Sequence, residues 1–122
     1  MIVFDSSIWI ELFVQGPKTE KIRPFLKPPW IVPEITLAEV SARFYAAGRT
    51  DLATALKSIV QDARLVGVSI PIAERAGFIR ESNKKDGLSI NDAVIWATAE
   101  HCGAKLLTLD HDFKPFKDAI IL

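Results

Sequence analysis

The chain has 122 residues, of which 49% are hydrophobic and 25% charged, and its 15 basic and 15 acidic side chains give a formal net charge of zero. This size and balance indicate one globular domain, residues 1–122, whose core is large enough to be stable without cross-links. Zero net charge does not favour a nucleic-acid-binding protein, and the single cysteine, Cys102, excludes an internal disulfide and a cysteine-rich metal site.

Along the chain, short apolar segments alternate with segments whose apolar residues recur at helical spacing. The short segments are almost continuously hydrophobic, which is typical of strands buried on both faces of a parallel sheet. In chain order, the expected elements are strand Ile2–Phe4, helix Ser7–Val14, strand Trp30–Val32, helices Thr36–Ala47 and Asp51–Ala63, strand Leu65–Ser69, helices Ile72–Ser82 and Ser89–His101, and strands Lys105–Leu109 and Ala119–Leu122.

Turn-forming residues set the expected ends of several elements. Pro17 ends the first helix, and Gly48 and Gly103 follow two later helices as C-terminal stops. Residues 16–33 and 83–87 predict loops, the first with room for one helical turn. The alternation of strands and helices predicts an α/β fold, a three-layer sandwich whose central parallel sheet is flanked by helices through right-handed crossovers.

The sequence also predicts the cellular location of the protein. No window approaches about 18 uninterrupted apolar residues, so no membrane span is expected. No basic segment precedes an apolar one at the N-terminus, so no signal peptide is expected. A single cysteine fits a reducing compartment, and we therefore expect a cytoplasmic location.

Two carboxylates directly follow apolar strands, in IVFDSS and in LLTLDHDF. Open α/β sheets bind ligands outside the carboxyl ends of their strands. Asp5 and Asp110 are therefore expected to lie close together if their two strands are neighbours. The alternative is that each acid is a turn residue or a helix cap, since Asp is common in both roles.

Two further acids lie near the starts of apolar helices. Thr36-x-x-Glu39 and Ser89-x-x-Asp92 both have the spacing of a capping box, in which the acid reaches back to its own helix terminus. The first turn of a helix that follows a parallel strand also lies at the carboxyl edge of the sheet. The sequence therefore leaves two interpretations open, simple capping or the convergence of four remote acids on one site.

Convergence of four carboxylates requires a counter-charge. Two carboxylates about 5 Å apart repel by roughly 3 kcal/mol at an effective dielectric constant of about 20, so a bare cluster would take up protons or spread apart. A hard divalent cation removes this repulsion, and an oxygen-only set of ligands favours Mg²⁺ or Mn²⁺ over Zn²⁺. Such ions polarise phosphoryl oxygens and activate water, the chemistry of phosphodiester hydrolysis.

The segments IVFDSS, TLAEV, SINDAVIWATA and LLTLDHDF, in this order, resemble the motifs of PIN-domain ribonucleases, and specifically those of VapC-type toxins from bacterial and archaeal toxin–antitoxin pairs. The resemblance covers nearly the whole chain and implies a PIN-like fold and a metal-dependent endoribonuclease. The resemblance implies that the acidic metal-binding and catalytic residues are Asp5, Glu39, Asp92 and Asp110. It also implies supporting residues: Ser7 matches the family's hydroxyl residue near the first acid, and Asp112 matches a further acid in the last motif.

The resemblance also implies a mechanism and partners. Asp5, Asp92 and Asp110 would hold the principal Mg²⁺ or Mn²⁺ directly, Glu39 would bind through water or hold a second ion, and Ser7 would contact a ligand water or the scissile phosphate. Members of the family cleave RNA, usually as homodimers. A cognate VapB-type antitoxin wraps the toxin and often points a basic side chain into the acidic site.

The charge balance fits an RNA substrate once the four acids are assigned to a metal. Without them the chain has 15 basic and 11 acidic side chains, a balance of +4. The cations expected to contact phosphate lie in the two loops, and the alternative is that they are ordinary solvated side chains; they are Lys18, Lys21, Arg23, Lys27, Lys84 and Lys85. Trp9 and Trp30 could stack on bases, whereas Trp96 is expected in core or dimer packing.

Two other classes of function fit the sequence less well. A PIN-like module that binds RNA or protein without cutting has no reason to keep a repulsive acidic cluster. A phosphotransfer receiver domain needs a phosphoacceptor Asp after a central strand, whereas Ser69 follows the run Leu65–Val68 in this chain.

Overall fold

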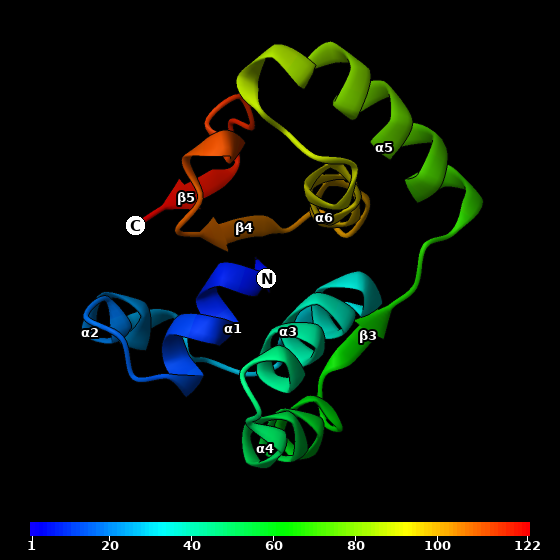
Figure 1. The fold of residues 1–122 in the computed structure, drawn as a ribbon. Coiled ribbons are helices and arrows are strands. Elements are labelled where there is room, and N and C mark those ends of the chain that lie inside the picture. The colour runs from blue at the N-terminus through cyan, green and yellow to red at the C-terminus, as the bar shows by residue number, and fades with distance from the viewer.

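The computed structural model describes residues 1–122, in which helices cover both faces of a five-stranded parallel sheet (Figure 1). In chain order the elements are β1 (Ile2–Phe4), α1 (Ser6–Phe13), α2 (Thr19–Ile22), β2 (Ile31–Pro33), α3 (Glu34–Ala46), α4 (Thr50–Val60), β3 (Arg64–Val66), α5 (Ile70–Ser82), α6 (Ile90–His101), β4 (Lys105–Thr108) and β5 (Ala119–Ile121), with 3₁₀ turns at Arg23–Phe25, Lys84–Asp86 and His111–Phe113. The predicted three-layer α/β sandwich is confirmed.

The order of the strands brings two distant parts of the chain together. The sheet order is β3-β2-β1-β4-β5, and all four pairings are parallel. Strand β1 pairs with β4 so that Phe4 lies opposite Leu107. The direction in which strands are added reverses between β1 and β4, and such a switch point forms a crevice at the carboxyl ends of the strands. Asp5 and Asp110 follow these two strands.

The two faces of the sheet carry separate cores. Val3 belongs to the core beneath α5 and α6, whereas Phe4 belongs to the core beneath α1, α3 and α4. Successive residues of a strand point to opposite faces, so one short strand supplies both layers. Figure 1 shows α5 and α6 on one side of β4 and the α1, α3 and α4 group on the other. Trp96 lies in the first core and stacks on Phe116, with ring centroids 4.8 Å apart.

Two predictions of local structure are wrong. Strand β3 is not buried on both faces: Leu65 is 44% exposed, because β3 forms the edge of the sheet and has one neighbour only. Helix α3 begins at Glu34, two residues before Thr36, so Thr36 lies inside the first turn and caps nothing. Pro33 has an extended backbone and is followed at once by the helix.

Turn residues at other boundaries act as expected. Gly48 and Gly103 follow the ends of α3 and α6 with positive φ angles of 70° and 62°, a conformation that glycine adopts without strain. The loop between α1 and β2 contains α2 and one 3₁₀ turn. No helix combines the length and the apolar character needed to cross a membrane.

Candidate metal centre

The Asp5 carboxylate is fixed by hydroxyl groups at the end of β1. Asp5 is 3% exposed, and its Oδ2 accepts hydrogen bonds of 2.8 Å from Ser7 Oγ and of 2.8 Å from Thr108 Oγ1. Ser6 Oγ lies 3.4 Å from Oδ1. These hydroxyl donors satisfy a buried side chain that forms no ion pair with a basic residue.

Ser7 and Thr108 also connect the two strand ends. The Leu109 N–H donates to Ser7 Oγ at 3.0 Å, and the Asp110 N–H donates to Thr108 Oγ1 at 2.9 Å. Each hydroxyl therefore gives its hydrogen to Asp5 and accepts from the backbone that carries Asp110. These hydrogen bonds fix the segment after β1 relative to the segment after β4, so Asp5 and Asp110 both lie at the carboxyl edge of the sheet.

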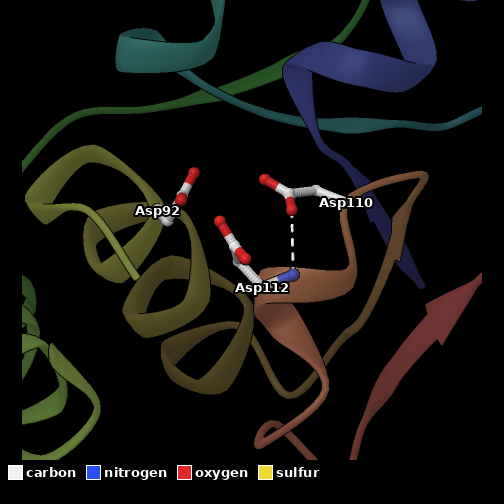
Figure 2. A group of neighbouring side chains, drawn as sticks. All are labelled: Asp92, Asp110 and Asp112. Carbon is white, nitrogen blue, oxygen red and sulfur yellow. Dashed lines mark hydrogen bonds between the residues drawn. The ribbon is translucent and has the colours of Figure 1, made fainter. Parts of the chain in front are cut away.

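Three acids gather beside this pair of strand ends. Asp92 from the first turn of α6, together with Asp110 and Asp112, offers carboxylate oxygens that all lie within 4.8 Å of one another (Figure 2). The Asp112 N–H donates to Asp110 Oδ1 at 2.8 Å, so the 3₁₀ turn orients Asp110. Asp112, expected in a supporting position, lies within the tightest group of acids, while Asp5 lines the same pocket as Asp92 and Asp110.

Asp92 has a structural contact as well as a place in the acid group. Ser89 Oγ accepts from the Asp92 N–H at 3.1 Å, and Asp92 Oδ2 accepts from the Ser89 N–H at 3.4 Å, which completes a capping box. Burial raises the pKa of the Asp92 carboxyl, the hydrogen bonds from Ser89 oppose this shift, and the nearby Asp5 and Asp110 charges add to it. The capping interpretation is therefore correct for Asp92 and does not remove it from the site.

Glu39 has no capping contact, because α3 starts earlier than its sequence spacing predicts. Burial raises the pKa of its carboxyl, and the charges of Asp5 and Asp92 raise it further, with the Asn91 side chain acting in the opposite direction. Its Oε1 atom is buried and has no hydrogen-bond partner. A buried carboxylate oxygen without a partner carries a desolvation cost that a bound cation would remove.

A pocket of about 320 Å³ opens over these residues. Its ten lining residues include three of the four predicted acids together with side chains from α1 and α3: they are Asp5, Ser6, Ser7, Ile10, Glu11, Val14, Arg43, Asp92, Leu109 and Asp110. Only oxygen ligands face a possible cation, with neither His nor Cys in the lining. This donor set and the unpartnered Glu39 oxygen suit a hard divalent cation.

Three residues near this site were not among the predicted site residues. Thr108 was treated only as part of a strand, although a strand's last residue before an acid can reach that acid. Glu11 and Arg43 both line the pocket. Glu11 lies four residues after Ser7, and Arg43 four residues after Glu39, so helical spacing places each on the same face as a predicted site residue.

The predicted phosphate-binding cations do not line the pocket. Lys18 donates to the Leu122 carbonyl at 3.0 Å. Arg23 pairs with Glu20, and Lys84 pairs with Glu81, each at 2.7 Å. Each of these three side chains therefore has a partner outside the pocket lining.

The parallel sheet, its switch-point crevice and the acids beside it define an α/β protein with an acidic site of a kind that can hold a metal ion. A family model described as "PIN domain" matches residues 2–118. The chain therefore belongs to the PIN domain family, a family of nucleases, and the predicted family is confirmed. Comparison with curated protein sequences found no significant match.

Several solved structures share the fold. A toxin–antitoxin complex from Klebsiella pneumoniae has 24% sequence identity and a TM-score of 0.83, covering 98% of this chain and 96% of that one. The sarcin–ricin-loop-cleaving toxin VapC20 of Mycobacterium tuberculosis has 20% identity and a TM-score of 0.80, with 97% and 96% covered. VapBC2 of Rickettsia felis, bound to a fragment of its promoter DNA, has 20% identity and a TM-score of 0.75, with 100% and 98% covered. At these identities the likeness establishes the fold.

Proposed function

We propose that this chain is a metal-dependent endoribonuclease that hydrolyses RNA phosphodiester bonds and acts as the toxin of a type II toxin–antitoxin pair. The observation that carries the proposal is the meeting of Asp5, Glu39, Asp92 and Asp110, from four separate segments, at the carboxyl edge of the sheet. Membership of the PIN domain family and the nuclease and toxin descriptions of the structural neighbours support it.

The proposed cofactor is Mg²⁺ or Mn²⁺. Asp5, Asp92 and Asp110 would hold the ion, Glu39 would act through water or a second ion, and Asp112 is close enough to Asp110 and Asp92 to share in the binding. When bound, the ion supplies Lewis-acid polarisation of the phosphodiester and activation of water.

The remaining steps of the proposed reaction belong to the protein. Ser7 and Thr108 hold the Asp5 carboxylate in one orientation, and Asp112 does so for Asp110 through its backbone N–H. Fixed carboxylates cost little reorganisation when substrate arrives, which is the basis of electrostatic preorganisation. The Ser7 hydroxyl hydrogen is already donated to Asp5, so we assign Ser7 to the positioning of that ligand.

The proposal includes a protein partner, by analogy with the complexes that the neighbours form. A groove of about 390 Å³ on the other side of α1 has an almost wholly apolar lining, which includes Trp9, Leu12, Phe13 and Trp30. The indole N–H groups of Trp9 and Trp30 are buried there without partners. A VapB-type antitoxin with an apolar segment would cover this groove.

We also propose a homodimer and a cytoplasmic location. Large apolar side chains are exposed on and after the edge strand, where a second copy could bury them: they are Leu65, Val68, Ile70 and Phe78. The single free cysteine is compatible with a reducing compartment.

Incubation of the purified chain with mixed single-stranded RNA tests the proposed function. We expect cleavage with Mn²⁺ or Mg²⁺ and none with EDTA. Asp5→Asn keeps an oxygen that accepts from Ser7 and Thr108 but removes the charge, so we expect it to fold and to lose about a thousandfold of activity. The matched control is Asp62→Asn, an exposed acid outside the pocket, which should cleave like the unmodified chain. RNA that stays intact both with Mn²⁺ and with Mg²⁺ would contradict the proposed nuclease activity and favour a PIN-like binding module.

A further inference from the structure

The acidic pocket contains one cationic side chain, Arg43 of α3. Arg43 follows Glu39 by four residues, slightly more than one helical turn and about 6 Å along the axis, and residues at this spacing share a face of the helix. The side chain therefore lies on the same side of α3 as one of the proposed metal ligands, at the rim of the pocket rather than among the acids of Figure 2.

No carboxylate neutralises Arg43. The four ion pairs of the structure join other residues. Glu11 is the pocket acid from the neighbouring helix, but its carboxylate lies against Gly16: a Cβ added to Gly16 would come within 1.3 Å of Glu11 Oε1. Arg43 is exposed and keeps its donors free for a ligand.

An anion is the ligand that such a guanidinium suits. Arginine presents a planar fork of N–H donors that matches phosphate oxygens two at a time, and charge-assisted hydrogen bonds of this kind are about twice as strong as neutral ones. A polyanionic strand that enters this pocket meets Asp5, Asp92 and Asp110 and needs positive charge along its path. None of the predicted loop cations lines the pocket, which leaves Arg43 as the cation at the site.

We propose that Arg43 contacts a backbone phosphate of the RNA next to the phosphate that is cleaved, and so fixes the register of the strand over the acids. This inference rests on the proposed ribonuclease function. The contact is to a phosphate that does not react, so it forms equally in the ground state and the transition state. Arg43 therefore contributes to binding of the substrate rather than to the chemical step.

Kinetics of the variants Arg43→Gln and Arg43→Lys test this assignment. We expect Arg43→Gln to raise KM about tenfold with kcat nearly unchanged, the signature of lost uniform binding. Arg43→Lys keeps the charge without the fork and should recover part of the loss. The dependence of log affinity on log salt should become shallower by about 0.7 in Arg43→Gln, the value for one phosphate contact on a single strand.

The matched control is Arg64→Gln. Arg64 is also exposed and forms no ion pair. It is the first residue of the edge strand β3, so it lies at the amino ends of the strands, whereas the pocket lies at their carboxyl ends. The Arg64→Gln variant should have the same KM, kcat and salt dependence as the unmodified chain. Equal losses in Arg64→Gln and Arg43→Gln would overturn the proposal, because both would then report general charge.

A binding measurement separates this inference from the proposed function. End-labelled single-stranded RNA of mixed sequence is titrated with the Asp92→Asn protein, with and without Arg43→Gln, in Mn²⁺. About tenfold weaker binding upholds the contact, even if the unmodified chain proves unable to cleave RNA. Unchanged affinity overturns it while cleavage by the unmodified chain leaves the nuclease intact. A fall in kcat alone, or no RNA binding by any variant, also overturns it.

Discussion

The N-terminal turns of α3 and α6 carry the same sequence pattern and have different structures. In α6 the hydroxyl and the acid form a capping box, because the helix begins directly after Ser89. In α3 the helix begins at Glu34, the Thr36 hydroxyl is buried without a partner, and Glu39 reaches no helix terminus. The spacing alone therefore does not decide whether an acid is a cap.

The difference separates two ways in which an acid comes to lie in the site. Asp92 is held by its own helix start and also faces Asp110 and Asp112. Glu39 has no structural contact that explains its half-buried, partly unpartnered carboxylate. The proposed function would explain the position of Glu39, whereas Asp92 combines a structural contact with a proposed functional one.

Substitutions of these two acids are expected to change the rate of RNA cleavage more than any other property. Asp92→Asn keeps an oxygen for the Ser89 N–H but removes the charge of a proposed direct ligand, so we expect a loss of about a thousandfold in RNA cleavage. Glu39→Gln removes a group that we propose to act through water, for which a loss of about ten- to a hundredfold is typical. Rates measured in Mn²⁺ check both values. The ranking is wrong if Glu39→Gln is the more severe change.

A smaller and opposite pair of effects is expected on stability. Ser89→Ala removes a cap and should lower the free energy of unfolding by about 1 kcal/mol. Thr36→Val removes a buried hydroxyl that has no partner and should raise it by about 1 kcal/mol. Urea unfolding of the metal-free proteins measures both. A loss of stability in Thr36→Val would mean that this hydroxyl has a partner after all.

The smallest effect is on the pH dependence of the metal-free protein. Burial, Asp5 and Asp92 raise the pKa of Glu39 above its ordinary value of 4.5, so the folded state binds this proton more tightly than the unfolded chain does. The resulting stability is fully present below the ordinary value and is lost as the pH rises through the raised pKa.

Melting temperatures in EDTA compare the unmodified chain with Glu39→Gln, which does not titrate at this position. The unmodified chain should lose stability relative to the variant as the pH rises above the ordinary value of 4.5 and through the raised pKa of Glu39. An unchanged difference across this range would show that Glu39 is not in a repulsive environment.

Much of the fold follows from local sequence patterns. All five strands and five long helices lie where apolar runs and helical spacing predict them, because parallel strands are buried enough to be continuously apolar. The errors occur where position in the sheet matters. Leu65 is as apolar as Leu106, but β3 is an edge strand and β4 is not. The order of strands in the sheet depends on the whole chain and cannot be predicted from the sequence of one strand.

The acids that line the pocket were accessible to sequence reasoning, because Asp5 and Asp110 follow strands and Asp92 lies in the first turn of a helix. What holds them was not accessible. The hydrogen bonds of Ser7 and Thr108 to Asp5 depend on the register that places Phe4 opposite Leu107, which no local pattern shows. Arg43 was not predicted because cations that contact phosphate are expected in exposed loops, whereas this one lies on the face of a helix that lines the pocket.

The central claim is that the acids share one cation at the switch point between β1 and β4. A crystal soaked with Mn²⁺ tests it most directly through the anomalous scattering of the metal. We predict a peak within ligand distance of Asp5, Asp92 and Asp110, with Glu39 oriented toward it. No peak in this pocket, or an ion held by Asp92, Asp110 and Asp112 with Asp5 outside its coordination sphere, would contradict the account.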